Sequence, residues 1–324
     1  MNIISLIKNK IHRYISIANA PLLQMMERSV LLNATVLANE NLARQRLKGL
    51  HEVEFSVYSQ WGEDGIISWL IDCLPDIPHT FIEFGVENYQ ESNTRLLLKM
   101  RNWRGLVIDG SQKHIEDIKN QGIYWRHNIT AKCAFIDRDN INNLIESADL
   151  TGEVGLLSVD IDGNDYWVWQ SIGVISPVIV VCEYNAVLGD LYPITIPYQA
   201  SFQRNNADPS NLYFGASIQA LISLGLSKGY TFVGTTSTGA NAFFIRNDRA
   251  SEICSLLEGV YGFPSKFREA RDVKGKLLYL NGNCRREVIN KLPFVDPISG
   301  ENVDLSDFKE IYSLEWIKGE GKEF

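Results

Sequence analysis

Four short apolar segments of this chain each end in a carboxylate. The four acids at these ends are Glu83, Asp109, Asp160 and Glu183. Continuous apolar segments of this length are typical of strands that are buried on both faces, as in a parallel sheet. Ligands of open parallel sheets bind just beyond the carboxyl ends of the strands. We therefore expect one acidic edge over one cleft, which suits a cationic or hydroxyl-rich ligand better than a phosphate.

The turn after the first of these strands contains Gly85 and Glu87. A dinucleotide-binding turn needs three glycines, so that the backbone can approach a pyrophosphate at a helix N-terminus. Only Gly85 is present here, and Glu87 stands where the phosphates would lie. A carboxylate about 4 Å from a phosphate costs several kcal/mol at an intermediate dielectric. S-adenosylmethionine fits better, because it carries a cationic sulfonium and an adenosine but no phosphate.

The second acid has the spacing of a ribose ligand. Asp109 lies 24 residues after Gly85, which is about where an acid binds ribose hydroxyls. Ser111 follows on the adenine side, and Asp137 could accept a hydrogen bond from the adenine amino group. Each acid alone could equally cap a helix or a turn. Glu83 and Asp109 together, at this spacing, favour the cofactor side of a site.

An ordered series of motifs resembles class I S-adenosylmethionine-dependent methyltransferases, and more closely the FkbM-like methyltransferases associated with bacterial surface-polysaccharide clusters. The motifs occupy residues 58–65, 81–87, 103–111, 156–167 and 183–185, within a similarity that covers roughly 58–246. The resemblance implies cofactor contacts from Gln60, Glu83, Gly85 and Glu87. The chain reads Asp160-Ile-Asp-Gly163 where the FkbM-like pattern has Asp-x-Glu-Gly, which leaves the acceptor open.

Methyl transfer to a hydroxyl needs an aligned nucleophile and removal of its proton by a base or a bound metal. Asp160 and Asp162 follow the fourth strand, while Glu183 and Asn185 follow the fifth. Asp160, Asp162 and Glu183 offer oxygen ligands that suit Mg²⁺ or Mn²⁺. Without a metal, Asp160 or Asp162 is the general base, with a pKa raised by neighbouring acids. Asp165 is expected only to cap the next helix.

Two further polar residues complete the predicted site. His127 falls near the end of a candidate third strand and is an alternative base, although a lone histidine is more often structural. Asn241 begins the last strand and could hydrogen-bond the acceptor together with Glu183 and Asn185.

Strands and helices alternate through the central part of the chain, which implies a parallel sheet with right-handed crossovers. The expected strands are residues 80–85, 105–109, either 123–127 or 133–136, 154–160, 177–183, 230–234 and 242–246. The expected helices are a helix capped by Ser59, then 92–99, 114–119, 140–147 and 218–224. The last two strands form a hairpin-like pair, so the last strand runs antiparallel. The expectation is a Rossmann-like α/β fold, with a seven-stranded mostly parallel sheet and helices on both faces.

Three regions are expected. Residues 1–52 form an N-terminal helical extension, 53–255 the methyltransferase-like domain, and 256–324 a C-terminal extension that packs on it. In the first region, Ile4, Ile7, Ile11, Tyr14, Ile15 and Ala18 make an apolar helical face beside Lys8, Lys10 and Arg13. That helix could mediate homo-oligomerisation or dock on a membrane surface. Residues 33–47 could form a second, more polar helix.

The composition limits the classes of partner and the compartments that fit this protein. The 324 residues carry a formal net charge of -8 and no basic block, which argues against nucleic acid. No segment has the roughly 20 apolar residues of a membrane span. Five scattered cysteines and an N-terminus without a signal-peptide pattern favour the cytoplasm. The sequence thus predicts a cytoplasmic O-methyltransferase acting on a sugar or surface-polysaccharide hydroxyl. The alternatives are a nucleotide-dependent sugar-modifying enzyme and a non-catalytic assembly protein with this fold.

Overall fold

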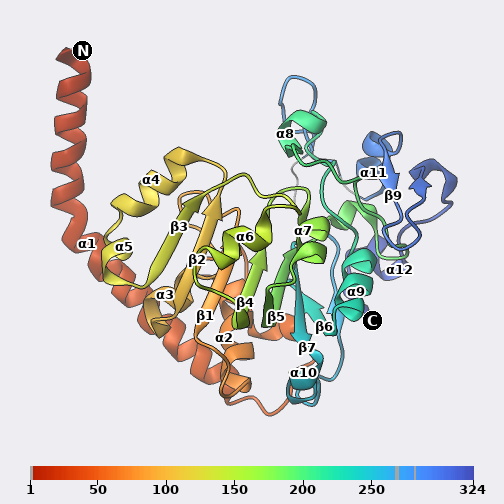
Figure 1. The fold of residues 1–324 in the computed structure, drawn as a ribbon, viewed down its shortest axis with the longest axis horizontal. Helices are drawn as coiled ribbons and strands as arrows, with labels where there is room; N and C mark the ends of the chain where they lie inside the picture. Colours follow the sequence, from red (N-terminus) through yellow and green to blue (C-terminus); the bar gives the residue numbers. More distant parts are fainter. Residues whose placement is uncertain (1–2, 267–269, 281) are drawn as a thin grey trace.

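A seven-stranded sheet forms the centre of the protein (Figure 1). The computed structural model describes the backbone of residues 3–266, 270–280 and 282–324, with side chains from residue 19 onward except that of Asn283. The strands are β1 (Thr80–Phe84), β2 (Arg104–Asp109), β3 (Ile129–Cys133), β4 (Gly152–Val159), β5 (Ile175–Glu183), β6 (Tyr230–Thr235) and β7 (Asn241–Arg246). Their order is β3-β2-β1-β4-β5-β7-β6, and β7 runs antiparallel to both of its neighbours. The expected sheet with a reversed last strand is confirmed.

Helices cover both faces of this sheet because neighbouring strand residues point to opposite sides. Phe81 packs into one apolar cluster and Ile82 into the other. The first cluster includes side chains of α2 (Glu63–Cys73), α3 (Arg95–Arg101), α4 (Gln112–Asn120), α5 (Gly122–Arg126) and α10 (Asn247–Cys254). The second includes those of α6 (Ile141–Glu146), α7 (Asp165–Ser171) and α9 (Ile218–Ser227). Each fully buried Leu, Ile or Phe contributes roughly 1.5–3 kcal/mol, so strands and helices stabilise each other.

The third strand lies between the two segments predicted for it. Residues 123–127 belong almost entirely to α5, and β3 begins at Ile129. β3 is an edge strand that pairs only with β2 and alternates between buried and part-exposed residues. It also contains Lys132, so it lacks the continuous apolar signal of the central strands.

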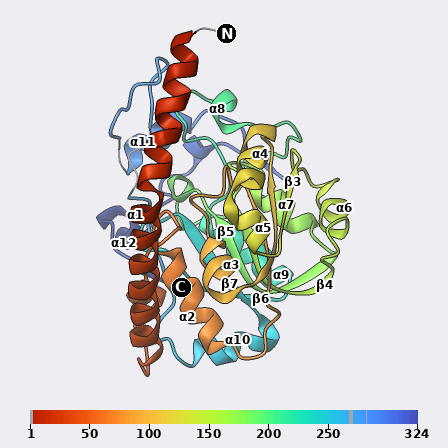
Figure 2. The same ribbon diagram turned by 90° about the vertical axis from the view of Figure 1, so that its left-hand side faces the viewer.

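One long helix replaces the two expected at the N-terminus. α1 runs from Ile3 to Leu42, and Pro21 lies inside it. Its first part extends away from the sheet domain, as Figures 1 and 2 both show. The predicted amphipathic face at residues 4–18 lies outside the described side chains. Further along α1, Glu27 contacts Tyr58 and forms an ion pair with Lys99, which fastens the helix to the domain.

Helix α2 begins later than expected, at Glu63 rather than at Ser59. The Ser59 hydroxyl does accept a hydrogen bond from the Asp64 backbone NH at 3.0 Å. The Asp64 carboxylate in turn accepts bonds from the backbone NH groups of Val57, Tyr58 and Ser59. Residues 57–62 therefore form a fixed loop before the helix.

The chain after β7 folds back onto the carboxyl edge of the sheet. Its elements are β8 (Tyr261–Gly262), α11 (Asn283–Ile289), β9 (Phe294–Val295), β10 (Asn302–Val303), η3 (Leu305–Asp307), α12 (Leu314–Lys318) and β11 (Lys322–Glu323). An ion pair of 2.9 Å joins Lys322 to the fully buried Asp190, just beyond η2 (Ala186–Leu188). Among the helices of the described part of the chain, none is both long and apolar enough to cross a membrane.

Candidate functional site

Two cavities adjoin at the carboxyl ends of the parallel strands, where ligands of such sheets bind. The larger, of about 670 Å³, is lined by the ends of β1, β4 and β5 and by later parts of the chain. The smaller, of about 200 Å³, lies over the ends of β1 and β2. Gly85, Glu87, Asp160 and Asp162 line both cavities. The four strand-end acids predicted from sequence therefore do lie around connected space.

The single glycine of the first turn is required by a close approach of two strands. Gly85 has φ +71°, and a Cβ there would lie 1.7 Å from the carbonyl oxygen of Asp160. The turn then places Glu87, exposed and also left-handed at φ +46°, in the lining of both cavities. This glycine brings β1 and β4 together, so its role does not depend on a phosphate.

Asp109 shapes the smaller cavity through the backbone on both sides of it. Its Oδ2 accepts the backbone NH of Glu87 at 2.8 Å, and its Oδ1 accepts that of Ser111 at 2.8 Å. The His114 Nδ1 lies 3.0 Å from the same Oδ1. Ser111 itself caps α4 by accepting the His114 backbone NH. Asp109 and the turn it holds line the smaller cavity, whereas Ser111 does not belong to its lining.

The Glu83 carboxylate is hydrogen-bonded to a loop of the protein. Its carboxylate accepts the hydroxyl of Ser92 at 2.6 Å, the backbone NH of Asn93 at 2.8 Å and the hydroxyl of Thr94 at 2.5 Å. Burial raises the pKa of Glu83, against the lowering effect of these donors. Glu83 lines the larger cavity but chiefly fixes the start of α3.

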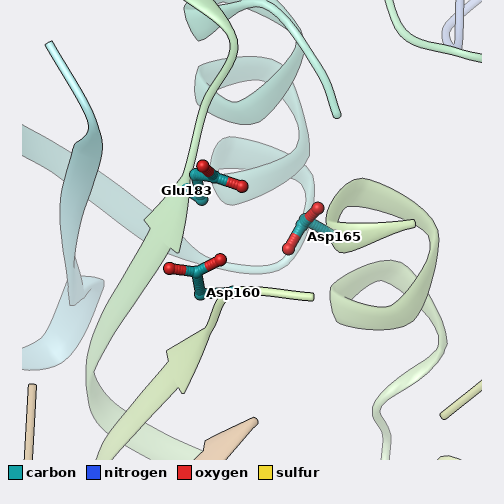
Figure 3. Close-up of side chains that lie close together, drawn as sticks. All are labelled: Asp160, Asp165 and Glu183. Atoms are coloured by element: carbon teal, nitrogen blue, oxygen red, sulfur yellow. The ribbon is translucent and has the colours of Figure 1, made fainter. Parts of the chain in front are cut away.

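Asp160, Asp165 and Glu183 bring their carboxylates together at the strand ends, each with an oxygen within 4.8 Å of the others (Figure 3). Burial, and next the charge of Asp162, raises the pKa of Asp160 well above its usual range. Burial, and next the charge of Asp160, does the same for Glu183. A buried Oε2 of Glu183 has no hydrogen-bond partner within the described residues. Like charges this close need a proton or a cation between them.

Asp165 takes the place that was predicted for Asp162. Its two oxygens accept the backbone NH groups of Ile161 at 2.7 Å and Gly163 at 2.8 Å, so it fixes the turn before α7, whose N-cap residue is Asn164. The same position brings it into the acidic cluster, where burial raises its pKa to about 6. Asp162 instead points outward, in the left-handed region at φ +54°. Its side chain is 62% exposed and pairs with Arg204, and Asp162 is not one of the three clustered acids.

Arg204 is the cation that pairs with an acid of this site, and no sequence pattern predicted it. It lies on the short helix α8 (Arg204–Ala207), which Figure 1 shows beyond the carboxyl ends of the strands. Its Nη1 lies 2.7 Å from Asp162 Oδ1, and its guanidinium stacks 3.6 Å above the Phe214 ring. Its charge lowers the pKa of both Asp160 and Glu183, against the larger raising effect of burial. A single arginine in a long polar loop gave no sequence signal.

Hydrogen bonds within the protein fix the side chains of two residues that were predicted to bind the methyl acceptor. The Asn185 side chain donates to the carbonyls of Leu212 and Phe214 and accepts the Val187 backbone NH, which fixes the long loop. Asn241 lies opposite Glu183 in the β5–β7 pair, and its Nδ2 donates to the buried Glu63 at 2.8 Å. Both asparagines line the larger cavity.

Gln60 also lines the larger cavity, next to Trp61, whose indole NH donates to the Gln60 side-chain oxygen at 3.0 Å.

Two residues that were predicted for the site lie outside both cavities. Asp137 accepts the backbone NH groups of Asp139 and Asn140 before α6, and it belongs to neither cavity lining. His127 precedes β3, so it lies at the opposite edge of the sheet, 3.3 Å from Asn102. The misplaced third strand caused the wrong placement of His127.

Phe135 was also missed. It lines the smaller cavity together with Ile136, directly after β3, and it is 46% exposed. An aromatic side chain exposed beside a cavity offers a face on which a planar base can stack. Phe135 fell inside the candidate strand 133–136, and no pattern around it predicted a ligand contact.

No protein-family model and no curated protein matches this chain. Among solved structures, the N-terminal domain of EvdMO1, solved in the presence of SAH and D-fucose, is 8% identical with a TM-score of 0.37, over 67% of this chain and 94% of that one. An S-adenosylmethionine-dependent methyltransferase from Clostridium acetobutylicum is 9% identical with a TM-score of 0.32, over 52% and 83%. The plantazolicin methyltransferase BamL is 13% identical with a TM-score of 0.32, over 52% and 77%. These likenesses are too weak to assign a family or an activity.

Proposed function

We propose that this protein is an S-adenosylmethionine-dependent O-methyltransferase that acts on a hydroxyl of a sugar or glycan. The observation that carries the proposal is the position of Asp160, which lines both the smaller and the larger cavity. A carboxylate at such a junction can serve a reaction between two ligands bound side by side.

The smaller cavity suits an adenosine. Phe135 offers a face for the base, and the turn held by Asp109 offers polar groups for a ribose. The exposed Glu87 lines both cavities, and its charge disfavours phosphates and favours a cation. When bound, S-adenosylmethionine would supply a methyl group on a positively charged sulfur.

The larger cavity would receive the acceptor, with Asp160 as its base. The acceptor oxygen would form a bond to the methyl carbon while the carbon–sulfur bond breaks, and Asp160 would take the hydroxyl proton. A raised pKa makes a carboxylate a stronger base, so the burial and crowding of Asp160 favour this role. Asp162, which pairs with Arg204, would position the loop at the cavity rather than take the proton.

A divalent cation is a second way to stabilise this site. Asp160 and Glu183 offer oxygens to a Mg²⁺ or Mn²⁺ ion, and Asp165 lies beside them. Asp162 is left out of this ligand set because it points toward Arg204. Activity that survives exhaustive chelation would exclude an essential metal, and the base role of Asp160 would remain.

Calorimetry with S-adenosylmethionine and S-adenosylhomocysteine tests the proposal directly. We expect both to bind, and the Asp160→Asn variant should keep this binding while it loses methyl transfer to a glycan acceptor. Absence of binding by either compound at millimolar concentration would contradict the proposal. Binding of NAD(P) in their place would favour the nucleotide-dependent enzyme.

A second candidate, an assembly protein of the same fold, is favoured by one observation on α1. Its large apolar side chains at Leu22, Leu23, Met25, Met26, Val30, Leu32, Val36 and Leu37 are exposed. Such a face could contact a second copy or a membrane surface. A truncated chain that starts at Glu52 separates the two functions: an enzyme should still bind S-adenosylmethionine, whereas an assembly protein should lose its partner. For the enzyme, we propose the cytoplasm as the compartment, because the five cysteines are scattered without paired spacing.

A further inference from the structure

The acidic and the basic residues that line the larger cavity come from different parts of the chain. The described acids come from strand ends and the turns that follow them: Glu83, Glu87, Glu91, Asp160, Asp162 and Glu183. The described cations come only from later segments: Arg204, Lys266 and Arg271. We call these six acids the acidic floor of the cavity and these three cations its cationic wall; Arg204 of the wall pairs with Asp162 of the floor.

The backbone of this cationic wall is fixed at the cavity. The Lys266 backbone NH donates to the carbonyl of Thr238 at 2.9 Å, and that of Arg271 donates to the carbonyl of Ser210 at 3.0 Å. Gly239, at φ +78°, lies so close to Pro264 that a Cβ there would approach its backbone to 2.4 Å. The wall is therefore anchored both to the turn before β7 and to the long loop after β5.

The two outer cations have spare hydrogen-bonding capacity. Lys266 Nζ contacts only the face of the Phe263 ring, 5.9 Å from its centroid, among the described residues. Arg271 uses one of its five N–H donors, in a bond of 3.0 Å from Nη1 to the Gly275 carbonyl. No carboxylate of the described residues pairs with either side chain. Both are exposed, so an incoming anion can reach them.

We propose that the acceptor carries an anionic group, a carboxylate or a phosphate, which Lys266 and Arg271 bind while its hydroxyl lies at Asp160. This inference rests on the proposed methyl transfer and narrows its substrate class. Charge-assisted bonds from an ammonium and a guanidinium to such oxygens are stronger than neutral ones. The acidic floor repels the same anion, so the two charges together would orient the acceptor in one direction.

Binding of three sugars to the SAH-saturated protein tests the proposal by calorimetry: D-glucuronate, D-glucose 6-phosphate and neutral D-glucose. We expect at least one anion to bind on the order of tenfold more tightly than glucose, with weaker binding at higher ionic strength. The glucuronate and phosphate arms distinguish a uronic acid from a sugar phosphate. Equal affinity of all three sugars, or no binding of either anion, would overturn the proposal.

The double variant Lys266→Ala/Arg271→Ala should lose this preference and keep its affinity for SAH. The matched control is Lys274→Ala/Lys276→Ala, which removes the same charge from exposed positions of the same segment outside the cavity lining. Weaker SAH binding by the first variant, with unchanged sugar binding, would instead assign the two cations to the cofactor. If the wild-type protein does not bind SAH, the proposed function fails, and the three sugars are then compared without SAH.

Discussion

Asp160 and Glu183 bring their carboxylates together at the ends of neighbouring parallel strands, and neither accepts a hydrogen bond from a described residue. Four other acids near the strand ends differ in this respect. Glu83, Asp109 and Asp165 each accept backbone NH groups, and Asp162 pairs with Arg204. Two neighbouring acids that accept no hydrogen bond reduce the stability of the folded protein. Such an unfavourable arrangement of charges is typical of a functional site.

Glu183→Gln should stabilise the protein at neutral pH. The pKa of Glu183 is raised in the folded state, so the folded protein binds more protons than the unfolded chain above the ordinary value of 4.5. Stability must then fall as the pH rises through the window above that value. At the upper end of this pH window, we expect the free energy of unfolding of the variant to exceed that of the wild type by about 1–3 kcal/mol. Urea unfolding as a function of pH measures it.

The control for this titration is Asp117→Asn on the exposed surface of α4. It removes one carboxylate far from the cluster, so the stability profile should stay within about 0.5 kcal/mol of the wild type. An equal gain in the two variants would mean that net charge, and not the contact between Asp160 and Glu183, causes the effect.

Gly85→Ala should strongly destabilise the fold. The new Cβ would meet the Asp160 carbonyl at 1.7 Å, and the residue would keep a φ of +71°. We expect a loss of roughly 3 kcal/mol or more, since backbone must move. Gly152→Ala is the matched control, because φ is +74° there and no atom lies within 4 Å of the added Cβ. It should cost only about 1 kcal/mol. Equal losses in urea unfolding would show that the approach of β1 to β4 can relax.

Arg204→Gln should raise the pKa of Asp160 and Glu183 further. Among the main effects on the pKa values of Asp160 and Glu183, the charge of Arg204 is the one that lowers both. The Arg204 side chain is only 11% exposed. Carbon-13 NMR of the two carboxyls measures the titration directly. Arg204→Lys retains the positive charge and should shift the titration less. Unchanged titration in Arg204→Gln would mean that water already screens the guanidinium.

Phe135→Ala should weaken binding of S-adenosylhomocysteine. Loss of a stacked aromatic costs about 1–3 kcal/mol per base, so we expect the dissociation constant to rise by roughly tenfold or more. Trp125→Ala removes another aromatic, 75% exposed and outside both cavities, and should leave binding unchanged. Calorimetry compares the two, and an equal effect would remove Phe135 from the proposed site.

The sequence by itself determined the parallel core and the edge where the site lies. Buried parallel strands need apolar side chains on both faces, so β1, β2, β4 and β5 have a continuous signal that ends at Glu83, Asp109, Asp160 and Glu183. The reversed last strand followed from a short hairpin-like connection. The edge strand β3 has no such signal, because only two of its five residues are buried. His127 and Asp137 were misplaced for that reason.

Only the tertiary structure decided which side chains meet and which remain available. Asp162 is exposed and pairs with Arg204, while hydrogen bonds from two backbone NH groups hold Asp165 in the cluster. Arg204, Lys266 and Arg271 come from segments far along the chain, and they reach the site because later loops fold back over the strand ends. Such contacts depend on long-range packing and local dihedral angles. Neither leaves a periodic pattern in the residues themselves.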